Sequence, residues 1–206
     1  MKQVLLIIAL LFSYSTINAQ ELIGTPKSLV LVYNYPENYF YLQLQGLDKR
    51  KTENENIFII DNRLIQVKTL KKSKFIKNTN QELTFSDFVK TYINWEKSYL
   101  EETFALNINS KVEFMKSKQG RDFGFWTYDM PIEKPVQVTD STRTTATQKQ
   151  IFVLTRIKDY LVGINSPLFE ANKFEETRNY LISNIDGIVE SRNEINVEEL
   201  NAQLNK

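Results

Sequence analysis

The sequence predicts an α+β protein in which an antiparallel β-sheet is flanked by α-helices, in the manner of an α/β/α sandwich. Two strongly apolar segments, 150–157 and 160–164, are separated by only two residues, which is typical of a tight antiparallel hairpin. Apolar residues then follow at spacings of three and four from Phe174 to Ile188, which is typical of a helix that lies on a sheet. Further strands and one more long helix precede this segment.

The closing segment contains signals for where each element begins and ends. Pro167 is expected to end the second strand, and Gly163 within that strand indicates a bulge or a close approach of two backbones. Asn172, with Glu175 three residues later, forms the pattern of a helix N-cap. The apolar stripe of this helix is expected to run to Ile188, with Val189 beside it. The same capping pattern at Asn196 predicts a short final helix over 197–204.

The first 19 residues have the composition of a secretory signal peptide. Lys2 precedes an apolar run, and small residues at 18–19 predict cleavage before Gln20. The alternative, a membrane-spanning helix, needs a longer apolar run than this one. We therefore expect a periplasmic or secreted protein. No cysteine is present to carry a lipid anchor, and no later segment is apolar enough to cross a membrane.

The remaining residues, 20–206, are expected to form a single α+β domain with a core over about 27–191. A Thr-rich polar stretch, 131–149, predicts a long mobile loop between two strands. Thr84 is expected to open the first long helix, with Asp87 as its capping partner. On that helix the apolar side chains share one side, and four charged residues are expected to face water: Glu96, Lys97, Glu101 and Glu102. The other predicted strands are 29–33, 39–45, 57–60, 64–70, 112–117 and 122–128.

The absence of histidine and cysteine excludes several kinds of chemistry. Zinc sites with histidine or cysteine ligands, Ser-His and Cys-His nucleophilic pairs, and thiol redox sites all need these residues. We therefore predict neither a cofactor nor a metal site. Without Lys2 the positive and negative side chains are equal in number, so nothing indicates nucleic-acid binding. We expect a monomer.

The order of strands and aromatic residues resembles the PsbP-like family over most of residues 27–191. The segment 29–44, with Tyr-Pro-Glu-Asn-Tyr at 35–39, is similar to the N-terminal hairpin of that family, although Tyr39 replaces a tryptophan. The segment 121–130 resembles the family's middle strand, and 150–185 resembles its closing hairpin and helix. The resemblance implies a sandwiched sheet and a binding or accessory role in the bacterial envelope. The metal-binding histidines of the photosystem members have no counterpart here.

Aromatic side chains are the candidate contact residues. Tyr35 and Tyr39 lie in one predicted hairpin, and Trp126 and Tyr128 lie at the end of another strand. If exposed beside the 131–149 loop, these rings would offer contact area to a sugar or a peptide. The competing interpretation is that they pack across strands in the core.

Charged residues offer two further alternatives. A pair of carboxylates can act as acid and base in glycoside hydrolysis, although no spacing selects a pair from the candidates. These candidates are Glu37, Glu96, Asp122, Asp129 and Asp159. The basic run from Lys68 to Lys77 is interpreted as a solvated strand end that protects a sheet edge, and alternatively as a contact for an anionic lipid or polysaccharide.

Two hypotheses about function follow. The preferred one is a non-enzymatic binding or accessory protein of the periplasm or cell envelope, with an unknown envelope protein or polysaccharide as its partner. The alternative is a secreted hydrolase that uses carboxylates and acts on carbohydrate. A pocket with two converging carboxylates would favour the hydrolase. Contact surfaces confined to the loops would favour the binding protein.

Overall fold

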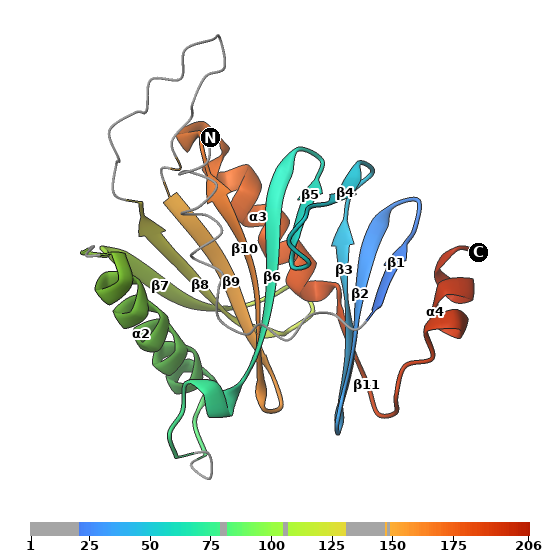
Figure 1. The fold of residues 1–206 in the computed structure, drawn as a ribbon, viewed down its shortest axis with the longest axis horizontal. Helices are drawn as coiled ribbons and strands as arrows, with labels where there is room; N and C mark the ends of the chain where they lie inside the picture. The colour runs from blue at the N-terminus through green and yellow to red at the C-terminus, as the bar shows by residue number, and fades with distance from the viewer. Residues whose placement is uncertain (1–20, 79–81, 105–106, 131–146, 148) are drawn as a thin grey trace.

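The computed structural model describes residues 21–78, 82–104, 107–130, 147 and 149–206 (Figure 1). The predicted signal peptide, 1–19, lies outside these ranges, and so does nearly all of the predicted loop, 131–149. Within the described ranges, no helix combines the length and the apolar character that crossing a lipid bilayer requires.

The described strands form two antiparallel sheets. The four-stranded sheet has the order β1-β2-β3-β11, and the seven-stranded sheet has the order β4-β5-β6-β10-β9-β8-β7. The strands are β1 (Glu21–Gly24), β2 (Ser28–Tyr35), β3 (Asn38–Gln45), β4 (Lys49–Lys51), β5 (Ile57–Ile60), β6 (Arg63–Lys71), β7 (Ser110–Lys116), β8 (Asp122–Asp129), β9 (Lys149–Ile157), β10 (Tyr160–Leu168) and β11 (Ile188–Ser191). The helices are α2 (Phe85–Phe104), α3 (Phe174–Asp186) and α4 (Val197–Leu204), with short 3-10 turns η1 (Lys72–Lys74) and η2 (Ala171–Lys173). The predicted α+β class, with antiparallel strands flanked by helices, is confirmed.

The predicted hairpin is the centre of the seven-stranded sheet. Strands β9 and β10 pair from Ile157 and Tyr160 onward, and Lys158 in the turn has a left-handed φ of 48°. The pairing of β10 is regular around Gly163 on both sides, so no bulge is present. A Cβ at Gly163 would lie 3.0 Å from Leu154 Cδ2, so the expected close approach is to a side chain. Strand β10 continues past Pro167 to Leu168, one residue beyond the predicted end.

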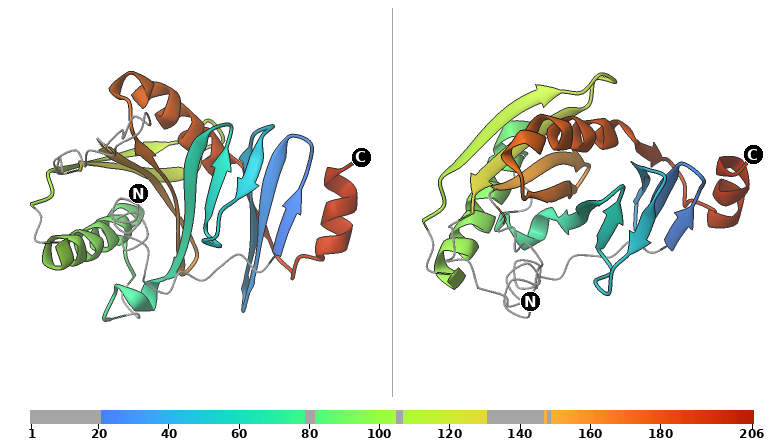
Figure 2. Two further views of the ribbon diagram at one scale, coloured as in Figure 1. Left: turned by 45° about the horizontal axis from the view of Figure 1, so that its top comes forward. Right: turned by 90° about the horizontal axis from the view of Figure 1, so that it is seen from above.

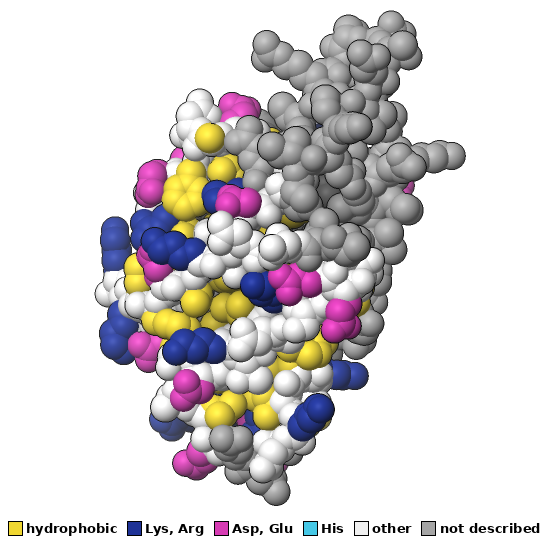
Figure 3. Space-filling model, turned by 90° about the vertical axis from the view of Figure 1, so that its left-hand side faces the viewer, with side chains coloured by type: hydrophobic (Ala, Val, Ile, Leu, Met, Phe, Trp, Pro, Cys, Tyr) yellow, Lys and Arg dark blue, Asp and Glu magenta, His cyan; other side chains and the backbone are white. Residues whose placement is uncertain are grey.

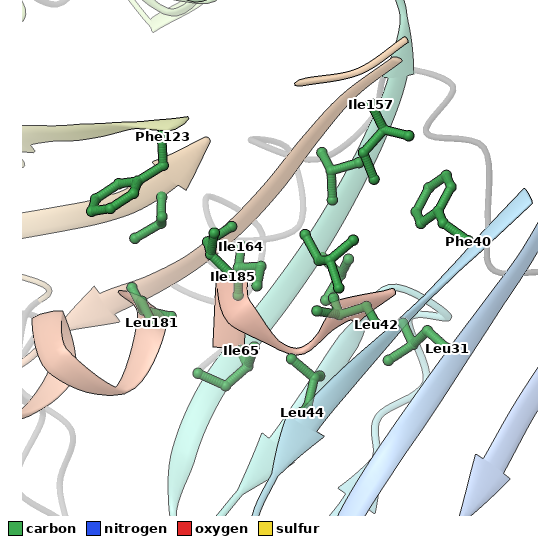
Figure 4. Close-up of a cluster of buried hydrophobic side chains, with 14 of the residues drawn as sticks. Leu31, Phe40, Leu42, Leu44, Ile65, Phe123, Ile157, Ile164, Leu181 and Ile185 are labelled. Carbon is green, nitrogen blue, oxygen red and sulfur yellow. The ribbon is translucent and has the colours of Figure 1, made fainter. Parts of the chain in front are cut away.

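The main core lies between the two sheets and α3. Alternating residues of β2 and β3 meet one face of the seven-stranded sheet, and α3 adds Leu181 and Ile185 to the same cluster (Figure 4). Helix α2 packs against the opposite face of the seven-stranded sheet, as the views in Figure 2 show. Both faces of the central strands are therefore covered, which explains why their sequences are continuously apolar.

The start of α2 agrees with the prediction. The backbone N–H of Asp87 donates to Thr84 Oγ1 at 3.2 Å, and the Thr84 hydroxyl donates to Asp87 Oδ2 at 2.7 Å. One of the otherwise unpaired amides of the first turn is satisfied in this way, and the Asp87 carboxylate lies at the positive end of the helix dipole.

The predicted boundaries of α3 are wrong at both ends. Asn172 lies in the 3-10 turn η2, and α3 begins two residues later at Phe174 without a side-chain cap. The helix ends at Asp186, and Ile188 belongs to β11, which pairs with β3. Gly187 makes this change possible because it has no Cβ, and a Cβ there would lie 2.8 Å from Gln43 O. This close approach also lets the Gly187 carbonyl accept a hydrogen bond from Gln43 N.

The C-terminal helix α4 covers the outer face of the four-stranded sheet. Its N-cap is the predicted Asn196, whose side-chain oxygen accepts from the backbone of Glu198 and Glu199. Leu200 packs with Ile23, Val30 and Val32 in a small separate cluster. Strand β1, which supplies Ile23, precedes the predicted core and has only four residues, so its sequence does not distinguish it from a loop.

Candidate functional site

A groove opens where several strand ends meet on one side of the seven-stranded sheet. It is an open, mainly polar hollow with a volume of about 630 Å³. Its lining combines the β7–β8 turn, the β9–β10 turn, the start of α2 and one residue of β11. The lining residues are Phe85, Gln119, Gly120, Arg121, Asp122, Thr155, Arg156, Lys158 and Glu190. We call this the hairpin-end groove.

Arg121 is held by the four-stranded sheet across the groove. Its Nη1 donates to Glu190 Oε1 at 2.9 Å, and its Nη2 donates to the Ile188 carbonyl at 3.0 Å. A guanidinium has five N–H donors, so these two bonds leave others for a ligand.

Arg156 is fixed in the same way from the other wall. Its Nη1 donates to the Leu83 carbonyl at 3.0 Å, and its Nε donates to the Lys158 carbonyl at 2.6 Å. The guanidinium carbon lies 4.7 Å from the centre of the Phe88 ring. This stacking and the two bonds hold the charge in place before any ligand arrives.

The third cation of the groove, Lys158, donates to the Glu37 carbonyl in the β2–β3 turn. The acidic side chains of the lining are already paired. Asp122 lies 2.7 Å from Lys116, and Glu190 lies against Arg121. The groove thus presents three ordered cations with two carboxylates that are partly neutralised, which is the arrangement expected of a site for an anionic group.

The predicted contact aromatics do not lie on a shared surface. Trp126 is 0% exposed, and Tyr35 and Tyr128 are each 3% exposed, so the expectation that they are reachable is wrong for these three. Tyr35 stacks on Tyr160 with ring centres 4.6 Å apart, which links the two sheets. Only Tyr39 is partly exposed, on the four-stranded sheet.

Trp126 and Tyr128 are buried because α2 covers their face of the seven-stranded sheet. The centre of the Trp126 ring lies 4.6 Å from that of Phe152 and 5.0 Å from that of Tyr128. Phe123 and Phe125 alternate with them and enter the main core on the other face. Both faces of this strand are therefore covered.

A buried ion pair joins α2 to the sheet. Lys68 Nζ lies 3.0 Å from both carboxylate oxygens of Glu96, and the two residues are 6% and 5% exposed. Two predictions are therefore wrong: Glu96 does not face water, and Lys68 does not protect an edge. Strand β6 is internal, between β5 and β10, and its Lys68 requires an acidic partner from the covering helix.

Tyrosine hydroxyls surround this ion pair. Burial raises the pKa of Tyr92 well above its usual value, and the Glu96 carboxylate raises it further. Burial likewise raises the pKa of Tyr128, with a smaller contribution from Glu96. Both hydroxyls therefore stay protonated and neutral at any physiological pH.

Several polar atoms of the same layer have no hydrogen-bond partner in the described part of the chain. Seven buried side-chain atoms are in this state there, and five of them lie between α2 and the seven-stranded sheet. These five are Tyr92 OH, Trp126 Nε1, Gln150 Oε1, Asn165 Nδ2 and Asn165 Oδ1. Buried polar atoms that lack a protein partner commonly bind ordered water in native cores.

The other candidate carboxylates are scattered and engaged. Asp129 pairs with Lys149 at one end of β9, and Asp159 lies 2.9 Å from Lys72 at the other. Glu37 is exposed in the β2–β3 turn with a φ of 62°. Among the described residues, no three acidic side chains gather in the manner of a metal site.

The groove residues Arg121 and Arg156 were not predicted from the sequence. Arg121 lies in a turn directly before β8, and Arg156 is the penultimate residue of β9, next to a turn. Both are common places for a charged residue in any hairpin. The grouping arises because the ends of the β7–β8 and β9–β10 hairpins meet beside α2 and β11. Residues that are far apart in the sequence carry no local signal of this contact.

Comparisons with known proteins give little beyond the fold. No protein-family model and no curated protein sequence matches the chain. The solution structure of cyanobacterial PsbP from Synechocystis sp. PCC 6803 is similar, with a TM-score of 0.49 and 7% sequence identity. The match covers 85% of this chain and 99% of that one.

Proposed function

We propose that this chain is an exported, non-enzymatic binding protein of the bacterial cell envelope that takes an anionic group in the hairpin-end groove. The observation that supports this function is the set of three cations, Arg121, Arg156 and Lys158, held around one groove by backbone carbonyls and an ion pair. Preorganised cations of this kind favour carboxylate or sulfate groups and lose little side-chain entropy on binding.

An acidic polysaccharide fits this groove better than a folded protein partner. The centre of a protein interface is usually apolar and aromatic, whereas Phe85 is the one aromatic residue of this lining. Polar side chains such as Gln119 and Thr155 suit hydroxyl groups between the charges. An open groove at strand ends also admits a long chain that extends beyond it.

The test uses trigalacturonic acid as the anionic ligand and maltotriose as its neutral counterpart. By isothermal titration calorimetry, we expect trigalacturonic acid to bind more tightly, with an affinity that falls as salt screens the charges. Lys158→Asn removes one cation and keeps a residue that accepts the left-handed turn conformation. We expect it to weaken binding about fivefold, the loss of roughly one solvent-exposed ion pair.

The matched control is Lys51→Asn, which removes an exposed lysine of β4 that does not line the groove. It should leave the affinity unchanged. Equal binding of the two trisaccharides, or equal losses in the two variants, would contradict the proposal.

The hydrolase alternative concerns the same groove, because Asp122 and Glu190 both line it, and it is tested by a separate activity measurement. A retaining or inverting glycosidase would release reducing ends from polygalacturonic acid, and Glu190→Gln would abolish that activity. Binding without any release of reducing ends is the result that we expect.

Export is a separate expectation. We expect the native envelope fraction to contain a chain whose intact mass corresponds to residues 20–206, because a signal peptidase cleaves after small residues such as those at 18–19. A mature chain that still carries Met1 would show that this expectation is wrong.

A further inference from the structure

We propose that β7 is the surface through which two copies of this chain associate, by pairing edge to edge as antiparallel strands. It lies at one end of the seven-stranded sheet, where β8 is its one neighbour among the described strands (Figure 1). The proposal is independent of the function proposed for the hairpin-end groove, because Lys111 and Glu113, which carry it, do not line that groove. It departs from the expectation of a monomer, because the open edge is apparent only from the order of the strands.

Strand β7 differs from the other described sheet edges in length and regularity. The edge strands β1, β4 and β11 have four, three and four residues. Strand β7 has seven residues, contains neither proline nor glycine, and pairs with β8 at every position without a bulge. Short strands, prolines and bulges are common means of keeping a strand edge from pairing with another chain. Strand β7 has none of these three, so its edge can accept a further strand.

The backbone groups that point outward from β7 follow from its pairing with β8. In an antiparallel ladder, only alternate residues exchange hydrogen bonds with a given neighbour. Just beyond one end of β7, Ser117 N donates to the Arg121 carbonyl at 2.8 Å. Just beyond the other end, Asp129 N donates to the Asn109 carbonyl at 3.4 Å. The odd-numbered residues of β7 therefore bond to β8, and the even-numbered residues direct their N–H and C=O groups toward the open edge. These even-numbered residues are Ser110, Val112, Phe114 and Lys116.

The side chains along this edge combine apolar with charged groups. Val112 and Phe114 are only partly buried in the layer under α2, and Met115 is only partly buried against the main core. Lys111 and Glu113 alternate with Val112 and Phe114, so they lie on the face opposite α2. Figure 3 views the molecule from the side of α2 and β7, and hydrophobic side chains are visible there between charges of both signs. Such an edge offers both apolar area and charge to a second strand.

The charges of β7 favour a second copy of the same strand as its partner. Lys111 Nζ lies 2.6 Å from Glu113 Oε1. This hydrogen bond and the lysine charge lower the pKa of the Glu113 carboxyl, so the carboxylate is ionised at neutral pH. When an antiparallel copy pairs about a two-fold axis through Val112, each Lys111 lies opposite Glu113 of the second copy. Opposite charges then meet on both sides of the axis.

The neighbouring registers lack this complementarity. An axis through Glu113 places the two Glu113 carboxylates opposite each other, which is destabilising. An axis through Phe114 places Lys111 and Glu113 opposite the uncharged Ser117 and Met115 of the second copy. We therefore expect the register about Val112, in which the two Val112 side chains also meet.

Sedimentation equilibrium of the purified protein measures this association. A contact made by a single strand edge is small, so we expect a weak dimer that is populated by about 0.5 mM protein. Lys111→Glu and Glu113→Lys each place like charges opposite each other in both pairs of the dimer. We expect each variant to weaken dimerisation at least about tenfold. Both side chains are exposed, by 76% and 39%, so circular dichroism should show an unchanged fold.

A mixture of the two variants tests the register directly. In a heterodimer of Lys111→Glu with Glu113→Lys, each residue at position 111 again lies opposite a charge of the other sign at position 113. We therefore expect the mixture to dimerise about as strongly as the parent protein, and the chain with both substitutions to do the same. The matched control is Lys51→Glu, a charge reversal on the opposite edge strand β4, which should leave the association unchanged.

Three results would overturn the proposal. The first is a parent protein that stays monomeric at about 0.5 mM, where even weak edge pairing would be populated. The second is a dimer that neither charge reversal weakens, because the contact would then lie elsewhere. The third is a pair of variants that remain monomeric when mixed. Binding of trigalacturonic acid should be the same in the parent and all these variants, so failure of this proposal is distinguishable from failure of the groove.

Discussion

Replacing Glu96 with alanine is expected to lower the free energy of unfolding by about 3–5 kcal/mol. The substitution leaves the Lys68 ammonium inside the protein, 6% exposed and without the carboxylate that lies 3.0 Å from it. An isolated buried charge loses its hydration and gains nothing in return, so its cost exceeds that of the lost ion pair itself.

Urea unfolding followed by circular dichroism measures this effect. Two variants provide controls: Glu102→Ala removes an exposed carboxylate from the same helix, and Lys68→Met with Glu96→Leu removes both charges together. The first should change stability by under about 0.5 kcal/mol, and the second should restore stability to within about 1 kcal/mol of the parent protein or exceed it. If the double variant were as unstable as Glu96→Ala, the cost would come from packing and not from an unpaired charge.

Replacing Leu181 with alanine is expected to cost about 2–5 kcal/mol. This side chain is 0% exposed. It packs from α3 into the main core, beside Ile185 and the strands of both sheets (Figure 4). The cost combines the lost transfer of its methyl groups out of water with the cavity that the rigid surroundings leave behind.

The matched control is Leu47→Ala, the same substitution at a side chain that is 76% exposed. It should change the free energy of unfolding by under about 0.5 kcal/mol in the same urea titration. Similar values for the two leucines would show that α3 does not pack on the sheets through this face.

Local signals in the sequence predicted the hairpins and two helix starts correctly. The β9–β10 hairpin follows from two apolar runs with a two-residue turn, and the caps at Thr84 and Asn196 follow from short polar patterns. Each depends on residues within a few positions of one another. Such features form wherever the local chain is placed, because their hydrogen bonds and dihedral preferences are satisfied locally.

Strand β11 shows where local reasoning failed. The periodic apolar pattern continues from Leu181 through Ile185 to Ile188, so a single longer helix was predicted. Gly187 was the available signal, because glycine after the last helical turn often ends a helix. Strand β3 then offers a free edge, and pairing with it satisfies the backbone groups of Ile188 and its neighbours.

The candidate site was less predictable than the fold. Glu96 was placed facing water because a carboxylate on an amphipathic helix usually does so, and its lysine partner lies 28 residues earlier in the chain. Trp126 was considered for a surface because it lies near a strand end that precedes the long polar stretch 131–149. Its burial depends on α2, which covers that face only in the folded protein.

The sequence by itself determined the α+β class, the central hairpin, the capped helix starts and the alternation of faces along each strand. These depend on periodicity and turn chemistry within short segments. The tertiary structure alone decided that the strands divide into two sheets, that the ends of two hairpins bring Arg121, Arg156 and Lys158 around one groove, and that polar atoms gather beneath α2. These features join residues that are far apart along the chain, and their energies appear only when distant segments exclude water together.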